Sequence, residues 1–228
     1  LYPLPAHVEK AFEGSGTLVL EVNLSAVDPI QMAALAFQYG RLEQGEKLDD
    51  LLTNELRQGL TAANIDISLY QDFRPWFLAV TLESQAALNS GMAAQEGIDS
   101  HFMQKALERS IPIKELETME FQLGLFRDLD LEGEQQLLMN ILVLLPDFQR
   151  VMDKVFQWWK MGDVNGLLSF LEDEFPQSSG NDLLYEVMIS KRNQGMAQKV
   201  SAMLANGGEI FVVVGALHLV GEEGLPSI

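Results

Sequence analysis

The sequence predicts an α/β fold that is rich in helix and contains a small, mainly parallel sheet. Three apolar runs have the length and the β-branched composition of buried strands, at residues 17–22, 111–115 and 210–214. Helical patterns fill most of the chain between these runs. The hydrophobic fraction of 47% is that of a globular protein, and 228 residues can form one large domain or two small ones. We expect a single domain over residues 1–228.

Composition excludes several classes of function. The chain carries 15 Lys and Arg against 33 Asp and Glu, which gives a net charge of −18. A phosphate backbone would be repelled, so we expect no nucleic-acid partner, and the simplest role of the charge is solubility. The chain has no cysteine, which excludes thiol catalysis, thiolate zinc sites and disulfides. No apolar stretch approaches the length of about 20 residues that a membrane span needs.

Start signals predict the helices of the first half of the chain. Pro5 suits the first turn of a helix that reaches Phe12, and Asp28-Pro29 begins another. The predicted helices are residues 5–12, 29–39, 47–52, 54–63 (capped by Thr53), 76–88 and 100–109 (capped by Asp99). Residues 65–70 are ambiguous. The first half of 76–88 has strand propensity, but the helical continuation and Pro75 favour a helix.

The second half reads as helices up to the last strand. The predicted helices are residues 119–128 (capped by Thr118), 133–145, 148–161, 164–175 and 182–206, with breaks at Pro146, Gly162-Asp163 and residues 176–180. We expect residues 119–179 to form a helical insertion that covers one side of the sheet and shapes access for a substrate.

Polar side chains follow all three predicted strands. Glu21 and Glu117 end the first two strands, and Gly215-Ala216-Leu217-His218 follows the third. Ligand sites of open α/β sheets lie at the carboxyl ends of the strands, so these groups would converge on one edge. The alternatives without a ligand are a salt bridge or a solvent-facing carboxylate for Glu21 and an ordinary turn histidine for His218. Asp99, in the polar segment 96–101, could line the same site or act only as a helix cap.

An arginine precedes the last strand. Arg192, followed by Asn193, lies in the predicted helix 182–206. Arg192 could be a surface charge, or it could reach the sheet edge and hold an anion or a carboxylate. The chain has no P-loop, G-x-G-x-x-G, G-x-S-x-G or H-E-x-x-H motif, so nucleotide transfer, serine hydrolysis and zincin chemistry lack support.

Several segments together resemble the TraB/GumN family. They are LYPLPAHVEKAFEGSGTLVLEVN, EGIDSHFMQKA, IPIKELETMEFQLGLF, KRNQGMAQKV and FVVVGALHLVGEEGL, in this order. The family belongs with the Tiki metalloproteases, the erythromycin esterases such as EreA, and ChaN-like proteins, and the resemblance covers nearly the whole chain. The family pattern has two GxxH motifs, a glutamate and an arginine. The resemblance implies that His218 closes the second GxxH and that Glu21 and Arg192 are the other two.

The resemblance also sets expectations for the ends of the chain. The first GxxH is expected on a strand upstream of LYPLP, where its absence would leave the apolar faces of residues 17–22 exposed. Neither His7 nor His101 lies in a GxxH motif, and the family continues beyond GLPSI. Family habit implies an extracytoplasmic location, either periplasmic, secreted or lipid-anchored, with any lipid anchor outside this chain. A cytoplasmic location stays open, and nothing in the sequence indicates the oligomeric state.

The resemblance implies a metal-dependent hydrolase of the peptidase or esterase type. The implied cofactor is a divalent ion, manganese or cobalt, held by His218 and Glu21. The resemblance implies Glu21, Arg192 and His218 as the catalytic residues. Glu21 would act as ligand or general base, and Arg192 would stabilise oxyanion charge or orient a carboxylate.

The residues implied on the substrate side are Asp99, Glu117 and Asn193, and the substrate would be a peptide or a small molecule. The alternative is a non-catalytic peptide- or haem-binding, regulatory protein of the same fold. A scaffold in polysaccharide or conjugation systems is a third possibility.

Overall fold

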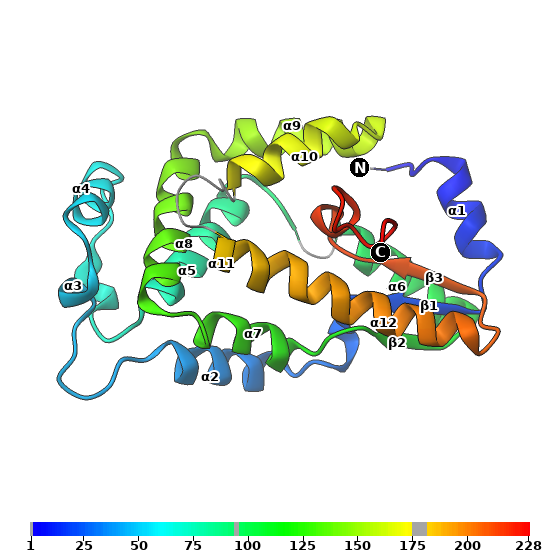
Figure 1. Ribbon diagram of the computed structural model, residues 1–228, viewed down its shortest axis with the longest axis horizontal. Coiled ribbons are helices and arrows are strands. Elements are labelled where there is room, and N and C mark those ends of the chain that lie inside the picture. The colour runs from blue at the N-terminus through cyan, green and yellow to red at the C-terminus, as the bar shows by residue number, and fades with distance from the viewer. Residues whose placement is uncertain (1, 94–95, 175–181) are drawn as a thin grey trace.

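Three short parallel strands form the sheet of this protein (Figure 1). The computed structural model describes residues 2–93, 96–174 and 182–228. β1 (Thr17–Leu20) lies between β2 (Ile113–Glu115) and β3 (Ile210–Val213), and both pairings are parallel. The register places Leu20 opposite Glu115 on one side and opposite Val213 on the other. The carboxyl ends of all three strands therefore meet at one edge, and the predicted helix-rich α/β fold is confirmed.

β1 is the buried strand, whereas β2 and β3 lie at the edges of the described sheet. Leu18 and Val19 are fully buried. The expectation that β3 is buried on both faces is wrong, because only Val213 of its four residues is buried. Helices cover both apolar faces of β1. Leu18 packs against α1 (Ala6–Glu13) and α6 (Ile98–Arg109), whereas Val19 packs against α12 (Lys191–Ala205).

The helices of the first half begin and end close to their predicted positions. Besides α1 and α6 they are α2 (Pro29–Gly40), α3 (Leu48–Leu51), α4 (Asn54–Ala62) and α5 (Pro75–Asn89). Asp28 accepts a hydrogen bond from Ile30 N, and Thr53 accepts one from Leu56 N, so both predicted caps are confirmed. The ambiguous segment contains a 3₁₀ turn at Ile67–Tyr70.

The second half contains α7 (Met119–Arg127), α8 (Leu131–Leu144), α9 (Phe148–Met161), α10 (Val164–Glu174) and α11 (Asp182–Tyr185), followed by α12. Thr118 caps α7 by accepting from Phe121 N. The predicted break at residues 176–180 and the end of the expected insertion lie outside the described residues. The predicted continuous helix 182–206 is wrong in one respect, because a π-helical turn at Glu186–Ser190 separates α11 from α12.

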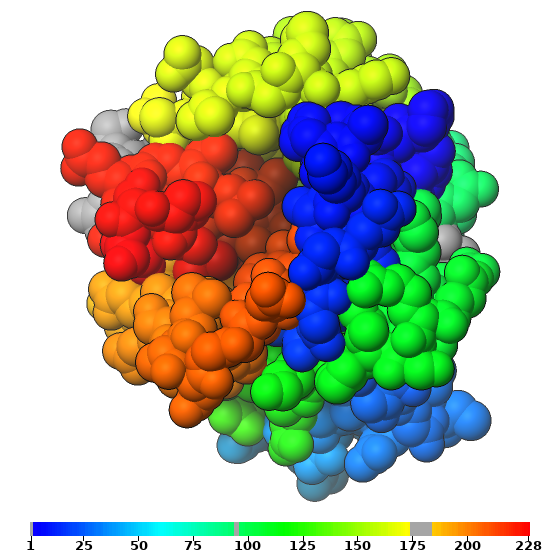
Figure 2. Space-filling model, turned by 90° about the vertical axis from the view of Figure 1, so that its right-hand side faces the viewer, coloured from blue at the N-terminus to red at the C-terminus, as the bar shows by residue number. Residues whose placement is uncertain are grey.

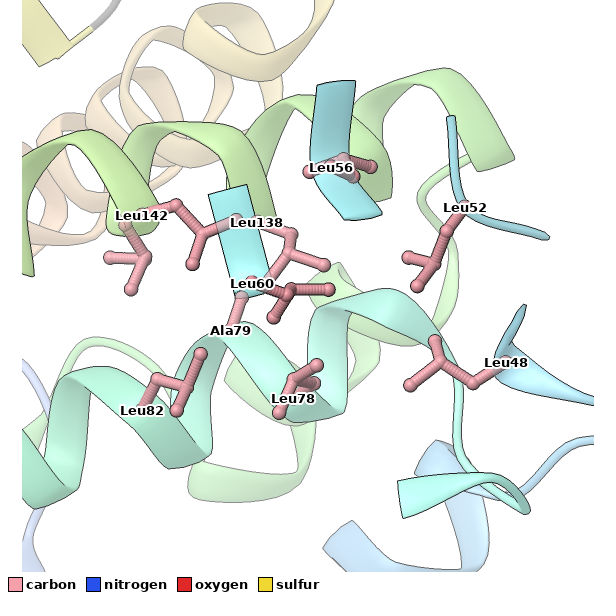
Figure 3. Close-up of a cluster of buried hydrophobic side chains, with 10 residues drawn as sticks. Leu48, Leu52, Leu56, Leu60, Leu78, Ala79, Leu82, Leu138 and Leu142 are labelled. Carbon is pink, nitrogen blue, oxygen red and sulfur yellow. The ribbon is translucent and has the colours of Figure 1, made fainter. Parts of the chain in front are cut away.

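A second core lies away from the sheet. Leucines of α3, α4, α5 and α8 pack together there, and Leu60, Leu78 and Leu138 are almost fully buried (Figure 3). Helices α7 to α10 lie beyond the carboxyl ends of the strands (Figure 1). Leu167 and Leu171 of α10 pack against Val220, which follows β3. Helices thus surround the edge of the sheet where the site residues were predicted. Within the described residues, every helix falls short of the length and apolar character needed to traverse a bilayer.

Candidate functional site

An arginine bridges the two glutamates that follow β1 and β2. Arg192 Nη2 donates to Glu21 Oε1 at 2.5 Å and to Glu117 Oε2 at 2.8 Å, and Arg192 Nε lies 3.1 Å from both Glu117 oxygens. Arg192 Nη1 donates to the Met188 carbonyl at 3.1 Å. The guanidinium thus holds two carboxylates in fixed positions through Nε and Nη2, while Nη1 is anchored by the backbone. Two roles were considered for Arg192, the stabilisation of oxyanion charge and the orientation of a carboxylate. These contacts match the second role.

A glutamine completes this group. Gln122 Nε2, from the first turn of α7, donates to Glu21 Oε1 at 2.7 Å and to Glu117 Oε2 at 3.0 Å. Sequence reasoning missed Gln122, because a glutamine early in a helix has no chemical signature of its own. Its spacing of one helical turn from Thr118, the cap that directly follows Glu117, is the signal that could have found it.

His218 is held in one orientation by a buried asparagine. His218 Nδ1 lies 2.6 Å from Asn193 Oδ1, and Asn193 Nδ2 donates to the Glu223 carbonyl at 2.7 Å. Because that carbonyl can only accept, the Asn193 amide must present its oxygen to the imidazole. The neutral ring therefore carries its proton on Nδ1, which leaves the Nε2 lone pair free.

Gly215 brings the histidine and the glutamate together. Gly215 N donates to Glu21 Oε2 at 3.0 Å. The backbone then turns through a 3₁₀ helix at Ala216–Leu219, which carries His218 back toward the sheet. A Cβ atom on Gly215 would lie 3.5 Å from Glu21 Oε2 and 3.5 Å from His218 Cδ2. Glu21 and His218 therefore border the same small space.

The charges of the site shift its pKa values. Burial alone would raise the pKa of Glu21, but the Gly215 N–H and the charges of Arg192 and His218 together lower it. Burial and the positive charge of Arg192 lower the pKa of His218, against the opposing effect of Glu21 and Glu117. Burial opposes the charged form of Arg192 too, yet the two carboxylates raise its pKa. At neutral pH Glu21 is ionised and His218 is neutral.

Asp99 lies on α6, near enough to Glu21 for the charge of that carboxylate to act on it. The helix begins at Ile98 with Gly97 as its N-cap, so the alternative reading of Asp99 as the cap is wrong. The cap forms earlier because Gly97 adopts the extended backbone conformation that a cap requires, which places Asp99 in the first turn. Burial, and then the negative charge of Glu21, raise the pKa of Asp99. The two carboxyl groups therefore interact, although one comes from a strand end and the other from a helix.

The π-helical turn contacts the site through two hydrogen bonds. Ser190 at its end is buried, and its Oγ donates to Glu223 Oε1 at 3.1 Å. The Met188 carbonyl in the same turn accepts from Arg192. Sequence reasoning missed Ser190 and Glu223, because the π turn that places Ser190 beside Glu223 has no signature in the sequence.

Solvent reaches the site mainly at Glu21. Its side chain is 19% exposed, whereas those of Arg192 and Glu117 are 11% and 5% exposed and His218 is buried. Figure 2 shows a hollow between α1, the helices α9 and α10, and the segment that follows β3. Asn193 is fully buried, and its side chain contacts His218 and Glu223.

The donors present suit a divalent ion only in part. Imidazole nitrogen and carboxylate oxygen are ligands that manganese and cobalt accept. The fixed Nδ1–H of His218 matches the outer hydrogen bond of metal-binding histidines. However, no group of three or more His, Asp or Glu side chains within residues 2–93, 96–174 and 182–228 is arranged to hold an ion. Arg192 and Gln122 occupy Glu21 Oε1, and the Gly215 N–H takes one lone pair of Oε2. His218 Nε2 and the second lone pair of Glu21 Oε2 are therefore the donors that this pair of side chains offers.

Fold and site together define a class of helix-rich α/β protein with an arginine-bridged glutamate pair and a histidine at the carboxyl edge of a small parallel sheet. The chain belongs to the TraB/PrgY/gumN family, whose model matches residues 1–228. It is similar to "Uncharacterized protein YbaP" of Escherichia coli (strain K12), with 29% identity over 99% of this chain and 81% of that protein. The protein of the same name from Shigella flexneri gives the same values. No solved structure gives a significant match.

Proposed function

We propose that this protein is a metal-dependent hydrolase of peptide or ester bonds. The observation that carries the proposal is the pairing of Glu21 with His218 across Gly215, at the strand edge where α/β proteins bind ligands. His218 presents an unprotonated Nε2, and Glu21 remains ionised in its polar surroundings. Both states are the ones that a metal ligand or a general base requires.

The proposal assigns a role to each residue of the site. His218 and Glu21 would hold manganese or cobalt, which when bound would polarise the scissile carbonyl or lower the pKa of a water. Alternatively, if Glu21 does not ligate the ion, this most exposed of the bridged residues would act as general base and receive the proton of the attacking water. Arg192 and Gln122 would fix the Glu21 carboxylate, and Asn193 would fix the His218 tautomer. Asp99 would contact the substrate from α6.

A non-catalytic binding protein is the second candidate, and one observation favours it. The guanidinium of Arg192 already pairs with both Glu21 and Glu117 and offsets one of their two negative charges, and its positive charge opposes a dication nearby. A protein that binds a peptide or a haem group through this edge would need no hydrolytic water. The two candidates differ in turnover, which an experiment can measure.

The first test measures ion binding and turnover together. Equilibrium dialysis against Mn²⁺ and Co²⁺ should show about one ion per chain, and a mixed peptide library should be cleaved only in the presence of the ion. Glu21→Gln and His218→Gln should each lower turnover by at least about a hundredfold, since each removes a proposed ligand. Ion binding without turnover would support the binding protein, and the absence of ion binding would end the proposal.

Gly215→Ala is a sharper probe of the same space. The backbone at Gly215 (φ −53°, ψ 137°) suits alanine, and the added methyl group would make only ordinary contacts with Glu21 and His218. We expect the variant to fold normally but to lose ion binding and turnover, because the methyl group fills the space between the proposed ligands. Gly195→Ala in α12 is the matched control, because no atom lies within 4 Å of its Cβ position. Equal activity in the two variants would contradict the proposed position of the ion.

A further inference from the structure

The chain folds back on itself directly after the histidine of the candidate site. Leu225 N donates to the His218 carbonyl at 2.8 Å, and Gly224 N donates to the Gly221 carbonyl at 3.2 Å within the same turn. Residues 218–225, which we call the return loop, are therefore closed by their own backbone hydrogen bonds.

The return loop is closed so tightly that residue 224 has no room for a side chain. A Cβ atom on Gly224 would lie 2.8 Å from the Val220 carbonyl oxygen and 2.9 Å from the Leu219 carbonyl carbon. Both are backbone atoms, which cannot move aside as the end of a flexible side chain can. An alanine at this position would have to push the loop open, and the carbonyl of Glu223, one residue earlier, would move with it.

The carbonyl of Glu223 sets the orientation of the Asn193 side chain. It accepts a hydrogen bond from Asn193 Nδ2 at 2.7 Å, so that Asn193 Oδ1 lies 2.6 Å from His218 Nδ1. Asn193 is fully buried, and a buried amide that loses a partner is costly. If the carbonyl moved away, the amide could turn and offer its nitrogen to an unprotonated Nδ1 instead. The position of one backbone oxygen thus decides which ring nitrogen of His218 carries the proton.

The side chain of Glu223 fixes the position of that oxygen. Ser190 Oγ, at the end of the π turn, donates to Glu223 Oε1 at 3.1 Å. The Tyr185 hydroxyl of α11 forms a hydrogen bond with the same carboxylate, and burial, the charge of Glu223 and this hydrogen bond raise the pKa of Tyr185. Glu223 is therefore attached to the π turn and α11 through its carboxylate and to α12 through its carbonyl.

We propose that Glu223 is a positioning residue of the candidate site. Its carboxylate holds the return loop against the π turn and α11, and its carbonyl thereby keeps the proton of His218 on Nδ1. The importance of this role rests on the proposed function, because a free Nε2 matters where it binds an ion. The position of the proton does not rest on that function, and it can be measured without any ion.

Long-range ¹H–¹⁵N correlation spectra of the whole chain, labelled at its histidines and held at pH 8 without added metal, report which ring nitrogen carries the proton. The chain has 3 histidines, and His218→Gln identifies the signals of His218. Its ring is neutral at this pH, because burial and the charge of Arg192 lower its pKa. We expect mainly the Nδ1–H form. In Glu223→Ala the ratio of the Nδ1–H to the Nε2–H form should fall about fivefold or more, as the loss of one ordinary hydrogen bond would produce.

Three further variants separate position from charge. Glu223→Gln keeps an oxygen that can accept from Ser190 and Tyr185, so it should restore the wild-type ratio. Glu222→Ala removes the same charge from the neighbouring exposed residue and should leave the ratio unchanged. Gly224→Ala removes no side chain, yet it should shift the ratio as far as Glu223→Ala does, because it moves the carbonyl. Circular dichroism verifies that each variant folds.

A wild-type ring protonated on Nε2 would overturn the proposal, and so would a ratio that Glu223→Ala leaves unchanged. Equal shifts in Glu223→Ala and Glu222→Ala would assign the effect to charge and would overturn it too. If Gly224→Ala does not fold, Glu223→Ala and its glutamine counterpart decide. Ion-dependent turnover without the expected shift would overturn only the role of Glu223, whereas the expected shift without ion binding would overturn only the hydrolase.

Discussion

At the scale of single residues, the site depends on one cation shared by two carboxylates. Glu117 is buried, and its side chain is paired with Arg192. A buried ion pair contributes little compared with an apolar pair, but the removal of one partner leaves an unpaired charge that is costly. The contacts of Arg192 therefore serve the position of Glu21 and make the arginine hard to replace.

Arg192→Met should destabilise the fold by about 3–5 kcal/mol, because Glu117 and Glu21 would lose their common partner. Urea unfolding followed by circular dichroism measures this change. Adding Glu117→Gln should restore part of the loss, since one unpaired charge is removed. Arg150→Met, which breaks the exposed pair with Asp147, serves as the control and should have little effect. A loss no larger than that of the control would contradict the buried position of Arg192.

Acid should weaken the protein in two steps. The folded pKa of His218 lies below its ordinary value of 6.5, so the stability that this histidine contributes is present above pH 6.5 and is lost as the pH falls through the folded pKa. The folded pKa of Glu21 lies below 4.5, so its contribution is lost at still lower pH. Thermal unfolding between pH 8 and pH 2 measures both. In His218→Gln the first step should be absent, and its persistence would show that another group causes it.

At the scale of elements, helix ends were predictable and the π turn was not. Asp28 and Thr53 accept hydrogen bonds from the backbone as capping residues do, and their residue types are visible in the sequence. The π turn at Glu186–Ser190 contains neither glycine nor proline and keeps a helical pattern. It forms where tertiary contacts, such as that of Ser190 with Glu223, outweigh regular helical pairing. For the same reason the sequence predicted that Arg192 could reach the edge of the sheet, but it did not predict which atoms Arg192 and Asn193 would contact.

Deletion of Glu186 should convert the π turn into ordinary α-helix. The residue is exposed, so its loss removes little packing, but one residue fewer rotates α12 by about 100° relative to α11. Arg192 and Asn193 would then point away from Glu117 and His218. We expect a drop in unfolding free energy similar to that of Arg192→Met. Glu186→Ala, which keeps the chain length, should change the unfolding free energy very little. Equal effects of the deletion and the substitution would argue against the π turn as the cause.

At the scale of the whole molecule, the helical layers and the convergence of strand ends followed from the sequence, but the strand order did not. Residues 17–22 and 210–214 are similar apolar runs, and only the pairing shows that the first is central and the second an edge. Glu21, Arg192 and His218 come together because the parallel strands end at one edge, which is a property of the fold class. The contact between Gly215 and Glu21 has no counterpart in the sequence pattern and is visible only in the folded chain.

The net charge of −18 should make stability depend on salt. Most of the 33 acidic residues cannot be paired by 15 basic ones, so repulsion opposes the compact state. The Debye length, over which charges act on one another, falls from about 30 Å at 0.01 M to about 10 Å at 0.1 M ionic strength. The melting temperature should therefore rise as NaCl is increased over this range. A fall would indicate that ion pairs such as Arg192–Glu21 outweigh the repulsion.

The central position of β1 has a consequence for synthesis on the ribosome. Its partner in β3 emerges much later, and Gly215 follows Glu21 by 194 residues. At about 5–20 residues per second, translation of that interval takes about 10–40 s. During this time one edge of β1 has no partner strand, and the nascent chain exposes an aggregation-prone apolar segment. The histidine that completes the candidate site arrives with the same late segment, so a ribosome that stalls before β3 leaves a product in which the site cannot form.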